Sequence, residues 1–290
     1  MEHRVKPQEE GLCLREILRR VMGVSYTAMK SAKWEDRILL NGVPTPVDRR
    51  VDAGDAVTLL PKDEKPAYPL LPYELPLDIP YQDAWLMVID KPAPLASQSS
   101  LGHPNDSLEN ALYAHLGCPT GFIYRPVNRL DKGTSGLMTV ALDAHTQHRC
   151  QQLLHTQDFV RIYLAVVEGH PAQPRGVIDL PIDKVDEASV RRIVTPQGKP
   201  SVTRYEVLAQ GRTRSLVRLQ LETGRTHQIR VHMQAIGHPV AGDFLYGREL
   251  PQLPGRFALH SAEIHLTHPM TGEKLHMISP MPDAFSALLD

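Results

Sequence analysis

Long apolar segments are missing from this chain of 290 residues, and cysteine is scarce. The longest apolar runs, such as 85–89 and 163–167, fall far short of the roughly 20 residues that a membrane-spanning helix needs. The three cysteines, Cys13, Cys118 and Cys150, have no C-x-x-C spacing, which disfavours a disulfide framework and a thiolate zinc site. The N-terminal residues contain no apolar segment before a small-residue cleavage site. We therefore expect a cytoplasmic protein with no membrane partner.

An excess of charge of one sign is also missing. Lysine and arginine number 32 against 33 acidic residues, which argues against a uniformly basic, histone-like protein. The charge is nevertheless unevenly spread, because residues 191–232 hold nine basic residues against two glutamates. Such a segment can present an electropositive surface to phosphates, since counterion release depends on local charge. Its arginines can equally pair with acids elsewhere, and composition leaves both interpretations open.

A proline-rich stretch divides the chain. Prolines stand at positions 61, 66, 69, 72, 76 and 80, and proline fixes φ and lacks a backbone donor. We expect residues 63–82 to form a stiff, extended linker. It would separate a small module, residues 1–62, from a large domain, residues 83–290.

The small module has the pattern of two helices followed by short strands. Apolar residues recur at helical spacing over 14–21, and Ser25 can cap a second helix that runs towards Trp34. Strands are predicted at 37–40 and 57–60, the first ending in an Asn-Gly turn.

This order of elements over residues 11–61 resembles the alpha-L RNA-binding motif, which occurs in a ribosomal small-subunit protein and in several RNA-modifying enzymes. The resemblance implies that basic side chains of the two helices contact RNA phosphates, namely Arg15, Arg19, Lys30 and Lys33. Charge alone favours the alternative of a solvated helical face.

The large domain alternates strands with helices, which indicates a mixed α and β fold. Strands are predicted at 85–89, 136–142 and 160–167. Asp143 can cap a helix, and Thr226 is a plausible cap for another, since apolar residues follow it at helical spacing.

The most specific local feature is the polar, glycine-containing loop 129–136, which leads directly into a strand. An acid among small residues before a strand is often only a turn former. This loop, however, resembles the signature loop of the RluA family of pseudouridine synthases, which detach uracil from its ribose in RNA, rotate it and rejoin it through carbon. Five further stretches agree with the family in order: 83–92, 161–169, 223–232, 237–247 and 259–282.

The resemblance implies an α+β fold, with a mixed, largely antiparallel sheet and flanking helices. It makes Asp131 the essential carboxylate, Tyr163 the active-site tyrosine and Arg230 the cation facing the aspartate. A guanidinium beside Asp131 would keep it ionised and able to attack, forming a covalent adduct with the sugar or the uracil. The tyrosine can stack on the base, and its oxygen is a candidate for removing the C5 proton. No redox step occurs, so no cofactor is expected.

The same resemblance implies a substrate-binding group beside these three residues, namely Arg129, Arg225, His227, Gln228 and Lys91. A base inside folded RNA must be flipped out to reach a carboxylate, at a cost of a few kcal/mol. The expected partner is structured RNA, with large-subunit ribosomal RNA favoured and transfer RNA as the alternative. We expect the protein to act as a monomer.

Two positions depart from the family pattern. Asn128 stands where a histidine is usual, and residues 96–98 replace a short run that usually ends in His-Pro. These departures put the substrate choice and the shape of the loop in doubt more than the reaction.

Three other functions compete with this one. The spacings of His145 with His148 and of His227 with His232 lack a convincing third ligand, so we expect no metal. Asp131 with Glu222 or Asp243 could instead form a glycosidase pair, which only the carboxylate separation can test. The third is a catalytically inactive RNA-binding or assembly protein.

Overall fold

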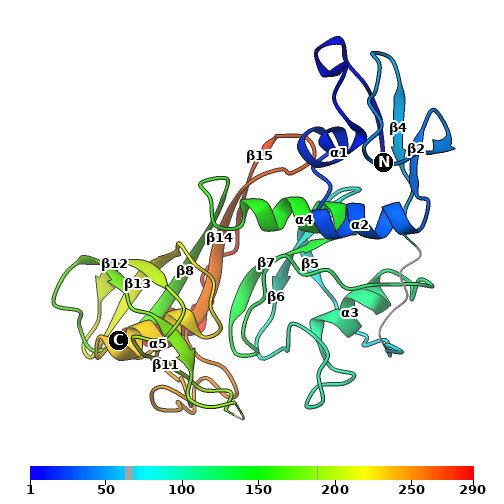
Figure 1. Cartoon of the computed structure of the whole chain (residues 1–290). Coiled ribbons are helices and arrows are strands. Elements are labelled where there is room, and N and C mark those ends of the chain that lie inside the picture. The colour runs from blue at the N-terminus through cyan, green and yellow to red at the C-terminus, as the bar shows by residue number, and fades with distance from the viewer. Residues whose placement is uncertain (63–67, 188) are drawn as a thin grey trace. The chain divides into compact units, whose positions relative to one another are not determined.

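The computed structural model describes residues 1–62, 68–187 and 189–290 (Figure 1). The chain divides into two compact units, Met1–Ala67 and Tyr68–Asp290. Residues 63–67 of the predicted linker lie outside the described residues. Within the described ranges, no helix is long and apolar enough to cross a membrane.

The first unit packs short helices beside a four-stranded sheet. Its strand order is β1-β4-β2-β3, and neighbouring strands are antiparallel. The strands are β1 (Glu2–Arg4), β2 (Ile38–Leu40), β3 (Val43–Pro44) and β4 (Ala56–Leu59). The helical segments are a 3-10 turn (Pro7–Glu9), α1 (Leu14–Glu16), a π-helical turn (Ile17–Val21) that continues α1, and α2 (Tyr26–Trp34).

The sequence pattern explains these elements. Leu14, Ile17 and Leu18 are fully buried in the core of this unit, as one stripe of a helix requires. The Ser25 hydroxyl accepts the backbone N–H of Ala28 at 3.1 Å, which confirms the predicted cap of α2. The strand β1, by contrast, was not predicted, since only three residues form it.

The second unit is built on a nine-stranded sheet of order β5-β6-β7-β14-β8-β13-β12-β9, with β15 paired to β14. Within the described residues, the strand pairings of this sheet are antiparallel except that of β7 with β14. The strands are β5 (Asp78–Gln82), β6 (Leu86–Lys91), β7 (Ser135–Ala141), β8 (Phe159–Glu168), β9 (Arg175–Asp179), β12 (Val202–Gln210), β13 (Arg214–Leu221), β14 (Leu259–Thr267) and β15 (Lys274–Ile278). A separate pair joins β10 (Ile182–Lys184) to β11 (Arg192–Val194). The α+β, largely antiparallel fold is thus confirmed.

Helices cover both faces of the β6–β7 half of this sheet. The described residues of the second unit form four helices, and the first two of them cover this half. They are α3 (Leu108–His115), α4 (Ala144–Leu153), α5 (Gln228–Ala235) and α6 (Asp283–Ser286). Met87 and Ile89 share one core cluster with Leu108 of α3, whereas Leu86 shares another with Cys150 of α4. Because successive strand residues point to opposite faces, α3 and α4 cover opposite sides of β6. The predicted cap Asp143 accepts the N–H groups of the first turn of α4.

The linker prediction is wrong beyond residue 67. Tyr68 already contacts the second unit, where its hydroxyl donates to the Glu109 carboxylate at 3.0 Å. Residues 78–82 form β5, an edge strand paired with β6, and the register shifts between Asp78 and Tyr81, across Pro80. A proline is tolerated there because an edge strand needs hydrogen bonds on one side only.

The predicted cap of α5 is also displaced. The helix begins at Gln228, so His227, with a left-handed φ of 59°, occupies the cap position in place of Thr226. The reason is a turn over residues 223–228 that the Gln228 side chain stabilises. Its oxygen accepts hydrogen bonds from the N–H of Arg225 at 2.9 Å and from the hydroxyl of Thr223 at 2.9 Å.

Candidate active site

The loop that carries Asp131 is tied down through its backbone. The N–H of Thr134 donates to the carbonyl of Asp131 at 3.0 Å, which closes a turn, and Leu95 donates to the carbonyl of Lys132 at 2.9 Å. The next strand requires Gly136, because a Cβ there would collide with the backbone of Ser261 on β14. The loop thus holds the Asp131 side chain where it remains 25% exposed.

The departures from the family pattern turn out to hold this loop. The Ser97 hydroxyl donates to the carbonyl of Leu130 at 2.6 Å and accepts the N–H of the same residue at 3.2 Å. The Gln98 side-chain oxygen accepts from Arg129 at 3.3 Å. Asn128 is buried, and its side-chain oxygen accepts the N–H of Thr139 on β7 at 3.0 Å. Ser97 and Gln98 therefore hold the Asp131 loop, and Asn128 joins the start of this loop to β7.

Arg230 connects Asp131 to a second, fully buried acid. Its Nη1 donates to Asp131 Oδ2 at 2.9 Å, while Nε and Nη2 donate to the two oxygens of Asp243 at 2.6 and 2.9 Å. Arg230 is 3% exposed and Asp243 is 0% exposed. Asp243 is itself fixed by the N–H groups of Leu245 and Tyr246. The bidentate pair fixes the plane of the guanidinium and leaves Nη1 directed at Asp131.

Aromatic rings surround the same guanidinium. Its carbon lies 4.2 Å from the ring centre of Phe257 and 5.0 Å from that of Tyr246. Burial alone would lower the pKa of Arg230, but the hydrogen bond to Asp243 and the charges of Asp131 and Asp243 outweigh it, so the pKa is raised. Arg230 is accordingly a fixed positive charge, held between two carboxylates and packed against aromatic rings.

His227 approaches the same oxygen of the Asp131 carboxylate as Arg230 does, with Nε2 at 3.9 Å from Oδ2. Burial lowers the pKa of His227, although the charge of Asp131 opposes this, so the ring is neutral at neutral pH. Its Nδ1 lies 2.8 Å from the Tyr246 hydroxyl, which already accepts the N–H of Arg192. If the Tyr246 hydroxyl donates to Nδ1, the ring proton of His227 lies on Nε2 and faces Asp131.

Tyr163 projects from β8 and is 4% exposed. Burial raises the pKa of its hydroxyl, and the nearby Arg161 charge and Ser261 hydroxyl lower it by less. The side chain is therefore a neutral phenol at neutral pH, so any role as a base requires that it first pass on its own proton.

A cavity of about 60 Å³ lies between these groups. It brings together seven of the eight residues predicted for catalysis and substrate binding, namely Asp131, Tyr163, Arg230, Arg129, Arg225, His227 and Gln228. Ligand pockets are usually about 300 to 1,000 Å³, so the site has to open for a nucleotide. Arg129 and Arg225 are the exposed side chains among its walls that can move aside.

The eighth residue, Lys91, does not line this cavity. It is fully buried, and its Nζ donates to the carbonyls of Pro92 at 3.0 Å and Leu95 at 2.8 Å. Burial lowers the pKa of Lys91 to about 7, with the charge of Asp131 opposing the shift. Its contacts join the end of β6 to the segment that supports the Asp131 loop.

The basic residues predicted on the small module are all exposed, on α1, its π-helical continuation and α2. They are Arg15, Arg19, Lys30 and Lys33. Arg19 also donates to the carbonyl of Val24 at 2.6 Å. In segment 191–232, Arg204, Arg214 and Arg230 pair with acids, as one of the two interpretations expects, and an electropositive surface for phosphates stays a prediction.

The two acids that the glycosidase alternative would pair with Asp131 each form an ion pair with an arginine. Asp243 is buried against Arg230, and Glu222 pairs with Arg204 at the surface. Apart from Asp131, the partners of Arg230 were not recognised from the sequence. Asp243 and Tyr246 lie in the matched stretch 237–247, which was a usable signal, whereas nothing in the sequence pointed to Phe257.

Comparison with known proteins agrees with this geometry. A family model described as RNA pseudouridylate synthase matches residues 85–235. The chain is 36% identical over 271 residues to the uncharacterized RNA pseudouridine synthase YjbO of Bacillus subtilis, covering 92% of this chain and 95% of that protein. It is 35% identical over 284 residues to ribosomal large subunit pseudouridine synthase D of Escherichia coli K12, covering 91% of this chain and 86% of that protein.

The fold has solved relatives as well. Human RNA pseudouridylate synthase domain containing 1 superposes with a TM-score of 0.60 at 28% identity, covering 74% of this chain and 86% of that chain. The resemblance drawn from the loop 129–136 and the five further stretches is therefore confirmed. The chain belongs to the RNA pseudouridylate synthase family, of the RluA type.

Proposed function

We propose that this enzyme isomerises uridine in structured RNA with Asp131 as the nucleophile. The observation that carries the proposal is the contact of Asp131 with Arg230, a cation that Asp243 holds in place at the wall of the cavity. The cation holds the carboxylate at the cavity, where it can attack a flipped nucleotide. The Nε2 atom of His227 lies 3.9 Å from the same oxygen, so this ring is a second group that can orient the carboxylate as a substrate approaches.

In the proposed reaction, the bond between the sugar C1′ and uracil N1 breaks, and Asp131 forms a covalent adduct with the sugar or the uracil. The detached base rotates, C5 bonds to C1′, the bond to Asp131 breaks and frees the carboxylate, and the C5 proton leaves as N1 gains one. Tyr163 packs against the base plane as a neutral phenol. For its oxygen to take the C5 proton, the phenol proton must first move to an acceptor. The Ser261 hydroxyl lies beside it and can relay a proton, whereas the protonated Arg161 guanidinium cannot accept one.

The cavity also supports a base-flipping step. A uridine in a stack cannot reach Asp131, and extrusion costs a few kcal/mol. We assign Arg129 and Arg225 to the flipped nucleotide, because both are exposed and both line the cavity. Gln228 and Lys91 act indirectly in this proposal. Gln228 stabilises the turn that presents Arg225, and Lys91 supports the loop of Asp131.

We propose large-subunit ribosomal RNA as the substrate, with transfer RNA as the second candidate. The similarity to ribosomal large subunit pseudouridine synthase D extends over 91% of the chain and so includes residues of the first unit. Exposed basic residues on α2, with exposed Tyr26 and Trp34, provide phosphate and stacking contacts for RNA. No cofactor is needed for the proposed steps.

The substrate assignment is tested by tritium release from C5-labelled uridine. Large-subunit ribosomal RNA and transfer RNA are offered separately to the enzyme, and release from the first alone is expected. Release from transfer RNA alone would refute the ribosomal assignment. The glycosidase alternative predicts reducing sugar from oligosaccharides without tritium, and a non-catalytic RNA-binding protein predicts only salt-sensitive association with RNA. Mapping pseudouridines in cells that lack the protein would then identify the modified position.

A further inference from the structure

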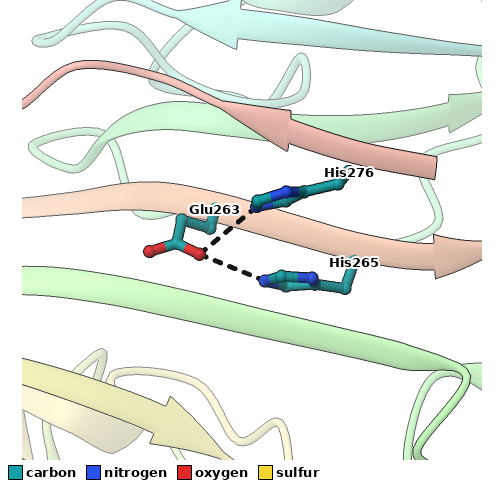
Figure 2. A group of neighbouring side chains, drawn as sticks. All are labelled: Glu263, His265 and His276. Atoms are coloured by element: carbon teal, nitrogen blue, oxygen red, sulfur yellow. Dashed lines mark hydrogen bonds and ion pairs between the residues drawn. The ribbon is translucent and has the colours of Figure 1, made fainter.

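Two histidines and a glutamate converge on one face of the β14–β15 hairpin, outside the active-site cavity. His265 on β14 lies directly opposite His276 on β15 in the antiparallel register, and Glu263 lies two residues from His265 on β14. Residues two apart on a strand share a face, so all three side chains point the same way. Figure 2 shows both rings directed at the Glu263 carboxylate, and the three ligand atoms lie within 4.8 Å of one another.

The separations suit a tetrahedral metal centre. The Nε2 atoms of His265 and His276 lie 3.1 and 3.4 Å from the same oxygen of Glu263. Zinc bonds of about 2.0 to 2.2 Å at tetrahedral angles separate neighbouring ligand atoms by about 3.3 to 3.6 Å. The two separations from Glu263 are therefore close to those of ligands that share one ion, and all three ligand atoms lie within 4.8 Å of one another.

The two histidine rings lie face to face. The His265 and His276 rings are stacked, with centres 4.0 Å apart and planes 16° apart. An imidazole nitrogen binds a metal through a lone pair in the ring plane, so at least one of the two rings has to turn about its side-chain torsions for both Nε2 atoms to bind the same ion. Lys274 lies two residues from His276 on the same face and is exposed, so its positive charge opposes the binding of a cation there.

We propose that Glu263, His265 and His276 bind one divalent transition-metal ion, with Zn²⁺ as the expected ion. Two imidazoles and a carboxylate are borderline donors, which suit Zn²⁺ better than Mg²⁺ or Ca²⁺, ions that prefer all-oxygen sites. The three ligands leave a fourth position for water. The ion joins β15 to β14, the strand whose first residue, Leu259, lines the active-site cavity.

The test uses the full-length, tag-free chain after chelator treatment, titrated with Zn²⁺ and then with Co²⁺ near neutral pH. We expect one equivalent of Zn²⁺ to bind and the Co²⁺ form to show the strong visible absorption of four-coordinate cobalt. The Zn²⁺ complex should unfold at a higher temperature than the metal-free chain, because an ion that binds only the folded state stabilises it.

Variants locate the site. Removing one ligand with His276→Gln or Glu263→Gln should weaken Zn²⁺ binding about tenfold or more and remove the four-coordinate cobalt spectrum. His103→Gln is the matched control. His103 pairs with one carboxylate, that of Asp106, and among the described residues no third ligand joins this pair. The proposal is overturned if the wild type binds no Zn²⁺ at about 100-fold molar excess. It is equally overturned if both ligand variants bind as tightly as the wild type.

Discussion

The Asp243 carboxylate should matter more for stability than Asp131 does, although Asp131 is the residue at the cavity. Asp243 is 0% exposed and accepts two hydrogen bonds from Arg230, so Asp243→Asn leaves a buried guanidinium with only half of its charge compensation. Removing one partner of a buried ion pair costs about 3 to 5 kcal/mol. Asp131 is 25% exposed, and its removal leaves Arg230 paired with Asp243, so Asp131→Asn should cost about 1 kcal/mol or less.

Asp243→Asn should also slow the chemical step without direct contact with the substrate. The neutral amide releases Arg230 from its bidentate position, and Nη1 is then no longer directed at Asp131. Loss of one preorganised electrostatic contact typically costs about 10² to 10³ in kcat. Single-turnover tritium release at saturating RNA measures this effect separately from binding.

Urea unfolding at neutral pH measures the stability effect, with Glu206→Gln as the control. Glu206 pairs with Arg175 at the surface, so its neutralisation should cost no more than about 1 kcal/mol. The reasoning is refuted if Asp243→Asn loses no more stability than the control and keeps the wild-type single-turnover rate.

Three further predictions follow from particular contacts. Burial lowers the pKa of Lys91 to about 7, so the unfolded chain binds more protons than the folded chain between pH 7 and 10.5. The free energy of unfolding should therefore rise with pH over that range, by up to about 1.4 kcal/mol per pH unit. Urea unfolding across that range should show this slope in the wild type and its loss in Lys91→Met; equal slopes would contradict the assignment. Ser97→Ala removes both hydrogen bonds to Leu130 and should lower kcat about tenfold while leaving RNA affinity within about twofold, whereas an unchanged kcat would exclude a positioning role. Trp34→Ala, at a residue 76% exposed, should weaken binding to structured RNA by about 1 kcal/mol or more at an unchanged saturating rate, with unchanged affinity as the contrary result.

Local signals in the sequence predicted local structure well. The Ser25 cap, the apolar stripe of the first helix and the Asp143 cap depend only on neighbours within one or two turns, and the structure has each of them. Errors arose where tertiary contacts decide the outcome. Residues 78–82 form an edge strand despite Pro80, and Gln228 holds a turn that moves the start of α5.

The active site was accessible from sequence only through family resemblance. Asp131 and Arg230 are 99 residues apart in the chain, and no periodicity brings them together. The buried partner Asp243 and the aromatic support from Phe257 depend on how the loops pack. In the same way, the pairing of His265 with His276 comes from strand register, which histidine spacing does not reveal.

The most direct test of the account is the Asp131→Asn variant in a single-turnover assay with labelled RNA. The substitution keeps the size of the side chain and removes the negative charge that contacts Arg230. We predict that pseudouridine formation and tritium release fall to background while the affinity for RNA stays within about threefold of the wild type, since Asp131 makes no phosphate contact in the proposal. Formation of pseudouridine by this variant at the wild-type rate would contradict the assignment of Asp131 as the nucleophile.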